Sequence, residues 1–390
     1  DKVKARPNVA ADAYRFNGRL DLQPVKNVTV AFGGSLERSK SRDFIDIYSL
    51  MDYDNNPQTI NTNWRAWGRI TQRFVSEGKE GASSALKSAY YSIQADYSRN
   101  MQTSQDYRLK DDLFRYGHVG KFTTYSVPFY QGEAITRPGL SDSLVFTQIA
   151  NFDTLYDFVP GDANPEISAY TSQYYDITDP LGTSGYQDSY GTLLLRGALV
   201  NGDNRNPLTV YGLWGTTGRL RNFYGETDNS QFRLTARGSV DINNHNIILG
   251  MEYEQRTDRG WSVNPSNLWS LMRQLSNSRL TGFDTTTAVI TSTTSGGTPI
   301  TFITYPNANY SPTTNLDGQV APGFFEKVRD HLGIAYTDTI QIDALDPSQL
   351  SLDLFSPDEL LDFGFVNYYG YTYTGEKLTG QPAYEDYFIK

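Results

Sequence analysis

The sequence predicts an all-β fold, specifically part of an antiparallel transmembrane β-barrel, on three observations. Long segments alternate strictly between apolar and polar residues, no segment is apolar enough for a transmembrane helix, and the connections between strands alternate between short and long. The clearest segment is residues 231–253, in which Phe232 and Leu234 share one parity while Arg233 and Arg237 share the other. A period of two predicts a strand whose two faces meet different environments.

The composition narrows the class of protein. The 390 residues carry 34 basic and 44 acidic side chains, a net charge of −10, and this argues against a general nucleic-acid surface because phosphate binding needs an excess of Lys and Arg. Cysteine is absent, which excludes disulfides, thiolate metal sites and a cysteine nucleophile. The 28 Tyr residues suit a boundary between lipid and water. A mean hydropathy of −0.51 is compatible with a barrel, in which only alternate residues face lipid.

The same alternation predicts eight long strands, paired in sequence order as four hairpins, with nearly all of their charges on one parity. A soluble β-sandwich would alternate in the same way. The connections favour the barrel, because outer-membrane barrels join their strands by short periplasmic turns and long extracellular loops. The predicted strands occupy residues 11–23, 28–39, 64–74, 85–101, 188–200, 208–221, 231–242 and 246–254, with short turns at 24–27, 76–85, 201–207 and 243–245 and long connections at 40–61, 102–187 and 259–363.

The connection at 102–187 must contain an even number of membrane crossings if all short turns lie on one side. Within it, the alternating residues 114–122 form either a ribbon inside an extracellular loop or a strand paired with residues 144–152. We favour the loop ribbon. Residues 1–258 are therefore assigned to barrel strands, with extracellular loops at 40–61 and 102–187.

The region 259–363 is predicted to be a long extracellular loop that carries short helices. Asn264 before Pro265 fits an N-cap followed by proline at the first helical position. Residues 281–322 are rich in Thr, Ser, Pro, Gly and Asn, which predicts an irregular loop. Ser356 and Glu359 form a capping box for a second helix that ends near residue 362. Residues 364–390 form a tail, and the aromatic segment 363–373 is a possible ninth strand.

Enzymatic and metal sites have no positive support in the sequence. Residues 52–56 resemble the start of a calcium loop, but Pro57 replaces the expected glycine. The acidic pairs Asp343/Asp346 and Asp358/Glu359 are explained better by capping and solvation than by catalysis. The three histidines lie far apart without a second ligand nearby, at His118, His245 and His331. We therefore expect no enzyme activity, metal or cofactor.

Arginines and loop aromatics are the candidate functional residues. Arginines on the polar parity are expected to line a lumen, either as a solvated inner wall or as contacts for an acidic plug: Arg15, Arg19, Arg65, Arg69, Arg73, Arg219, Arg233 and Arg237. Aromatic rings in the long loops suit a sugar or peptide ligand, although loop packing explains them equally well: Trp261, Trp269, Tyr174 and Tyr175.

Three segments carry a resemblance to a known family: YRFNGRLDLQPVKNVTVAFGGSLERS at 14–39, TDNSQFRLTARGSVDINNHNIILGMEYEQRTDRGW at 227–261, and YGYTYTGEKLTGQPAYEDYF at 369–388. They resemble the middle of the barrel in large TonB-dependent outer-membrane receptors of the Bacteroidetes type. The resemblance implies a 22-stranded barrel in the outer membrane with an N-terminal plug, energised through a TonB contact, that imports a bulky ligand.

The sequence departs from that family pattern. It contains no plug domain or TonB-box region, begins at Asp1, and ends at Lys390 rather than on the terminal Phe typical of a closing strand. We therefore expect the chain to be the middle of a longer polypeptide, surrounded by outer-membrane lipid, with the plug and TonB contact outside it and with a surface lipoprotein or other outer-membrane subunits as partners. Two alternatives remain open: a barrel that serves as a structural or assembly subunit, and a secreted soluble sandwich that acts as an adhesin.

Overall fold

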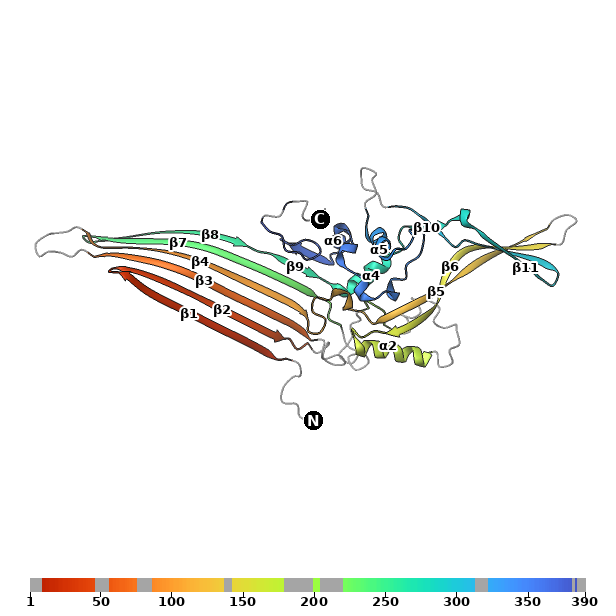
Figure 1. Ribbon diagram of the computed structural model, residues 1–390, viewed down its shortest axis with the longest axis horizontal. Helices are drawn as coiled ribbons and strands as arrows, with labels where there is room; N and C mark the ends of the chain where they lie inside the picture. The colour runs from red at the N-terminus through yellow and green to blue at the C-terminus, as the bar shows by residue number, and fades with distance from the viewer. Residues whose placement is uncertain are drawn as a thin grey trace, which may run out of the picture.

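The computed structural model describes residues 9–45, 56–75, 86–136, 142–178, 199–203, 220–312, 322–380 and 383. Its main sheet contains six long strands, each antiparallel to its neighbours, which extend across the left half of Figure 1. In sheet order these strands are β1 (Ala11–Val25), β2 (Val28–Arg42), β3 (Pro57–Val75), β4 (Leu86–Asp106), β7 (Tyr224–Ile242) and β8 (His245–Thr257). The predicted class, mostly antiparallel β structure, is confirmed. The described strands form an open sheet.

The two faces of the main sheet differ in the way the alternation predicts. The register places Ile70, Ile93 and Met251 in line across the sheet, on the apolar face. This face is exposed, with Met251 67% and Leu249 73% accessible. Phe232 is also exposed, and no described residue forms a second layer that buries it. In the part of the chain that the structure describes, the apolar face is therefore uncovered.

The short turns lie together at one end of the main sheet. Two-residue turns join β1 to β2 and β7 to β8, and Asn27 and Asn243 take positive φ of 68° and 51° there. Asn tolerates this left-handed conformation, which tight hairpin turns require. We call this end the turn end. The opposite end, here the body end, carries the rest of the described chain (Figure 1).

The predicted hairpin at 188–221 does not lie between β4 and β7, where sequence order would put it. Strand β4 pairs directly with β7 from Leu86/Ile242 to Ser104/Gly225, so no other strands lie between them. Residues 204–219 lie outside the described part of the chain, and the described flanks are not strands. Leu199 and Leu220 are instead buried in a small core with Phe122 and Ile167. Within the described residues the main sheet has six long strands; the other two of the eight expected strands fall mostly outside them.

The connection between β4 and β7 contains a separate hairpin. Strand β5 (Gly120–Ile135) pairs with β6 (Ser143–Pro160), so residues 144–152 do have a partner, but it is 127–134 and not the predicted 114–122, and the pair lies outside the main sheet. The predicted even number of crossings is compatible with this, because β4 and β7 are direct antiparallel neighbours. Residues 114–122 are not one ribbon: η2 (Leu113–Arg115) precedes β5. Helix α2 (Pro165–Thr178) follows β6.

The segment 281–322 contains strands where we expected an irregular loop. Strands β11 (Val289–Ser295) and β12 (Thr298–Thr304) form a hairpin, and β12 pairs in parallel with β6. The sheet β11-β12-β6-β5, which we call the arm, extends away from the main sheet (Figure 1). The missed signal is Gly296-Gly297, with φ of 58° and 85°, between two segments rich in Thr and Ile. Such a pair favours a two-residue hairpin turn.

The remaining elements form a small globular part at the body end, which we call the body. Its helix α4 (Pro265–Leu275) and helix α6 (Pro357–Asp362), with the Ser356 capping box, confirm two predictions. The predicted ninth strand is shorter than expected, since only β14 (Val366–Tyr369) pairs with β9 (Gly260–Val263). The other elements are β10 (Leu280–Phe283), η4 (Thr285–Thr287), β13 (Ala308–Tyr310), α5 (Phe324–Leu332), η5 (Ile342–Ala344), η6 (Pro347–Gln349) and η7 (Leu352–Leu354).

The body has an apolar core of its own. Trp269, Phe324 and Phe355 are fully buried in it, and the last two rings stack at 4.5 Å. Arg329 is buried with them and donates to the carbonyl oxygens of Ser276, at 2.6 Å, and of two further residues. Among the described residues, no helix is both long enough and apolar enough to cross a membrane.

Candidate functional site

The candidate site is the polar face of the main sheet, where three hollows follow one another from the turn end to the body end. Residues opposite each other in an antiparallel sheet point to the same face. The register therefore carries the polar parity across six strands, for example from Asn17 through Arg65 to Arg256. We call the three hollows the basic cavity, the wall cavity and the rim cavity.

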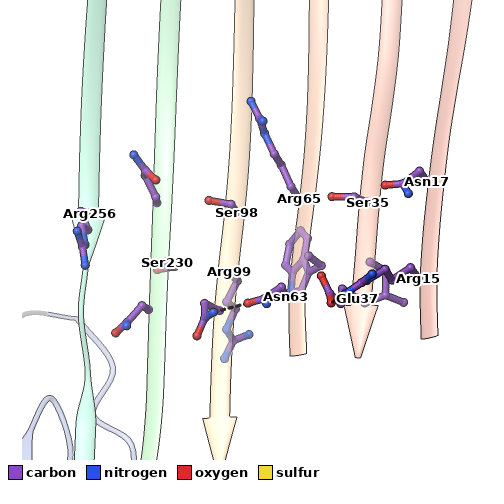
Figure 2. Close-up of a pocket in the computed structure, with 15 residues that line it drawn as sticks. Arg15, Asn17, Ser35, Glu37, Asn63, Arg65, Ser98, Arg99, Ser230 and Arg256 are labelled. Atoms are coloured by element: carbon purple, nitrogen blue, oxygen red, sulfur yellow. Dashed lines mark hydrogen bonds and ion pairs between the residues drawn. The ribbon is translucent and has the colours of Figure 1, made fainter. Parts of the chain in front are cut away.

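The wall cavity has a volume of about 690 Å³ and is lined by side chains from all six strands (Figure 2). Arg15 pairs with Glu37 across β1 and β2 at 2.8 Å. Arg65 and Arg256 lie on the same row from different strands, and Arg256 pairs with Asp258 at 2.9 Å. Most of the other lining groups are hydroxyls and amides: Asn17, Ser35, Asn63, Ser98, Asn100 and Gln231.

A single buried carboxylate joins the wall cavity to the basic cavity. Asp96 is only 6% exposed and lies 3.3 Å from Arg65, which lines the wall cavity, and 3.4 Å from Arg233, which lines the basic cavity. Two cations on one carboxylate leave a surplus of positive charge on the wall. Asp96 therefore fixes the positions of two arginines without neutralising both.

The basic cavity, nearer the turn end, has a volume of about 570 Å³ and an excess of positive charge. Its lining contains four arginines and one glutamate, Glu252, so its formal net charge is +3. Arg69, Arg73 and Arg237 form no ion pair with any residue that the structure describes. This part of the wall can attract an anion, because its cations are held beside few acids.

The rim cavity, of about 550 Å³, lies at the body end on the same face. Gln102 pairs with Thr227, which pairs with Gly260 in β9, so these residues continue the polar rows. Aromatic rings border them: Tyr369 is 64% exposed and Phe223 lies at the start of β7. Neutral polar groups beside exposed rings can hold a ligand by hydrogen bonds and by contact with its apolar surface.

The aromatic residues predicted as ligand contacts lie in different environments in the structure. Trp261 lines the rim cavity, although it is mostly buried and its indole N–H donates to the carbonyl oxygen of Tyr373 at 3.1 Å. Trp269 is fully buried in the body, where its N–H donates to Phe114 O, so its prediction as a ligand contact is wrong. Tyr174 and Tyr175 belong to α2, and their side chains lie outside what the structure describes.

The arginines predicted to line a lumen all have the polar parity, and all but one of them lie within the described residues. Arg219 is the exception. Arg19 pairs with Asp21 at 2.8 Å and lies 6.0 Å from the Trp67 ring centre, on the same face. The others line the wall cavity or the basic cavity: Arg15, Arg65, Arg69, Arg73, Arg233 and Arg237.

The acidic pairs have structural contacts. Asp343 receives the Arg273 guanidinium at 2.8 Å and the Asn201 amide at 3.1 Å. Asp346 caps η6, and its hydrogen bonds from Ser348 are the main cause that lowers its pKa to about 2. Glu359 accepts from the backbone N–H groups of Ser356 and Phe324. Asp358 lies in the first turn of α6.

The histidines do not meet, and His118 alone is buried. It is 4% exposed, lies 5.3 Å from the Trp269 ring, and neither ring nitrogen has a hydrogen-bond partner. Burial lowers the pKa of His118 to about 4. In the described part of the chain, no cluster of three or more His, Asp or Glu side chains is arranged to hold a metal ion. Residues 52–55 of the calcium-like segment 52–56 are outside the described residues.

Sequence reasoning missed the rim cavity and the role of Asp96. Asp96 could have been found, because its parity matches Arg65 and Arg233 on neighbouring predicted strands. The rim cavity could not, since it requires β9 and β14 to pair beside β7. Comparison with protein-family models and with curated proteins finds no match to this chain.

Proposed function

We propose that the chain is the barrel and loop segment of an outer-membrane receptor of the TonB-dependent type, which imports a bulky ligand. In this proposal the apolar face meets lipid, the polar face lines a water-filled passage, and the turn end is periplasmic. The observation that carries it is the arrangement of all three cavities on one face, opposite an exposed apolar face. The rim cavity is the first contact for a ligand that enters from outside.

The size of the apolar band supports contact with lipid. Six strands about 4.8 Å apart span about 24 Å, and an apolar stretch averaging about 26 Å along each strand gives a band of about 600 Å². The largest apolar patch on a typical soluble monomer is about 300 to 600 Å². The flat area of this band is already at the upper end of that range, and the side chains that project from it make its accessible apolar surface larger. A lipid environment removes the cost of exposing it.

The height of the band also fits a bilayer. Aromatic pairs border it in β3 and β4: Trp64–Tyr97 at 5.2 Å nearer the body end, and Phe74–Tyr91 at 6.1 Å nearer the turn end. Ten residues separate Trp64 from Phe74, which is about 33 Å along a strand. At a tilt of about 40° this gives about 25 Å along the membrane normal, the height of the apolar band in outer-membrane barrels.

The open sheet requires more strands in this proposal. Strands β1 and β8 have no further neighbour in the described residues, and unpaired backbone groups are not tolerated in lipid. We infer that strands outside the described residues pair with both edges and close the barrel. A plug, a TonB contact and a surface lipoprotein belong to the same proposal and lie outside this chain.

Single cysteines test the environment of the two faces, because the chain has no cysteine. Thr235 lines the basic cavity, and Leu249 lies on the apolar face. In cells that express the natural polypeptide, Thr235→Cys should react with a water-soluble maleimide, while Leu249→Cys should react only with a lipid-soluble one. Labelling of Leu249→Cys by the water-soluble reagent would refute the lipid face, and no labelling by either reagent would indicate a second protein layer.

The transport function is tested by what cells remove from their medium. Compounds that the parent strain depletes and a deletion strain leaves behind define the cargo. Coupling a bulky maleimide to Thr235→Cys should reproduce the deletion because it obstructs the passage, whereas the same treatment of Leu249→Cys with the lipid-soluble reagent should not. A deletion that leaves the medium unchanged but dissociates an outer-membrane complex would favour the structural or assembly subunit instead.

A further inference from the structure

The arm has two edge strands, and they differ in how well they are protected. Its order is β11-β12-β6-β5, so β11 and β5 each leave one side without a described partner strand, although the side chain of Gln341 bonds the outer edge of β5 at Thr124. Free N–H and C=O groups on such an edge are a template for another strand. Proteins block unwanted pairing with charged side chains, with proline and with bulges.

Strand β5 carries all three of these protections. Lys121 and Glu133 are charged residues near its two ends, and Pro128, near its middle, has no N–H to donate. Its register with β6 also shifts twice, between Thr124 and Ser126 and again next to Phe129. An incoming strand would therefore meet an irregular edge at β5.

Strand β11 carries none of them. No charged residue occurs from 285 to 316, no proline lies within β11, and the register with β12 runs without a shift from Val289/Thr304 to Ser295/Thr298. All seven residues of β11 are exposed, and five of them are β-branched. β-Branched residues favour a strand, so β11 is a regular and unprotected template.

We propose that β11 pairs with β11 of a second copy of this chain, antiparallel about a two-fold axis near Ser292. In this register Thr291 faces Thr293 of the other copy, and such hydroxyl pairs are favourable across strands. A charge at the centre of the strand would face its own copy and oppose pairing, and β11 has no charge. The two arms then form one continuous eight-stranded sheet.

The difference between the two edges also sets the size of the assembly. Pairing through β11 buries both unprotected edges, and the outer edges of the combined sheet are two copies of the protected β5. A two-fold interface of this kind is closed, so growth stops at two copies. The arm extends away from the main sheet and body, which leaves β11 accessible to a second copy (Figure 1). This inference does not depend on transport through the barrel.

The test uses Ser292→Cys in the natural polypeptide, in its own membrane, with a short bis-maleimide crosslinker. The new thiol is the only cysteine of this chain, and the matched control is Ser126→Cys, an exposed serine on the protected edge β5. We expect at least tenfold more crosslinked dimer from Ser292→Cys than from Ser126→Cys. Adding Thr293→Lys to Ser292→Cys should return the dimer to the control level, because a charge then lies in the paired strand.

Three results would overturn the proposal. The first is equal crosslinking of the two single-cysteine variants. The second is a crosslinked product at Ser292 whose mass matches a different protein, since the edge then serves another partner. The third is a dimer that persists with Thr293→Lys. Proteolysis patterns equal to those of the parent protein confirm that the variants are folded, so a lost crosslink reports on pairing.

Discussion

Replacing Leu249 with arginine distinguishes a lipid-facing wall from a solvent-exposed one. Leu249 is 73% exposed and lies opposite Gly238 of β7, so the change removes little packing within the protein. On a surface in water, such a substitution changes the free energy of unfolding by about 0.5 kcal/mol or less. Leu249 lies in the same row as Tyr91, near the border of the apolar band, where arginine on the outer face of a barrel costs about 1 to 2 kcal/mol, less than at the bilayer midplane.

Strand β8 offers a matched control in the next residue. Ile248 is also aliphatic and 61% exposed, but it lies on the polar face, opposite Ser239. Ile248→Arg should therefore change the free energy of unfolding by about 0.5 kcal/mol or less. The two variants differ in the face that receives the charge and in little else.

Guanidinium titration of the natural polypeptide in lipid vesicles measures the difference. We expect Leu249→Arg to lower the free energy of unfolding by about 1 to 2 kcal/mol relative to Ile248→Arg, which is about 5- to 30-fold in the folding equilibrium. Values for the two variants within about 0.5 kcal/mol of each other would refute the lipid-facing assignment. Repeating the titration in detergent micelles shows whether the cost depends on an intact bilayer.

Further predictions concern the body and the polar wall. Because the folded-state pKa of His118 is depressed to about 4, the unfolded chain binds more protons between about pH 6.5 and 4, and the unfolding free energy should fall by about 3 kcal/mol as the pH falls through that window. His118→Phe should remove this dependence, as monitored by the fluorescence of Trp269 beside it, and a slope that persists would assign it to other groups. Arg329→Met should destabilise the body by about 3 kcal/mol or more, because buried carbonyl groups lose their donor. The exposed Arg256→Met should cost less than about 0.5 kcal/mol in the same denaturation assay, and equal losses would contradict the role of Arg329. Asp96→Asn should raise the chloride-to-potassium permeability ratio of the reconstituted, unplugged barrel, and an unchanged ratio would remove Asp96 from the passage.

The local sequence was sufficient to predict an element where the residues within that element reflect its surroundings. The period of two identified the long strands, because each residue contacts either the apolar or the polar side. Pro265 at the start of α4 and the capping box of Ser356 and Glu359 at α6 identified these helices for the same reason, since both signals act on backbone groups only a few residues away; Asn264 itself makes no side-chain cap hydrogen bond. The candidate arginines followed from parity, and those in the described residues share one face.

Errors arose where a fact depends on residues far apart in the chain. The direct pairing of β4 with β7 is set by contacts between segments more than a hundred residues apart, so sequence order wrongly suggested that a hairpin lies between them. Trp261 and Trp269 are eight residues apart in similar contexts, yet only Trp261 lines a cavity. Residues rich in Thr and Gly were assigned to a loop, although β12 becomes a strand beside β6.

The sequence by itself therefore determined the alternating faces, the grouping of short turns and the charge of the polar wall, because periodicity and composition are local properties of a strand. Tertiary structure alone decided which strands are neighbours, where the rim cavity opens, that Trp261 and Trp269 are both buried, and which edge of the arm is left unprotected. Those features depend on pairing between distant segments, and hydrogen bonds between strands leave no local signature in either partner.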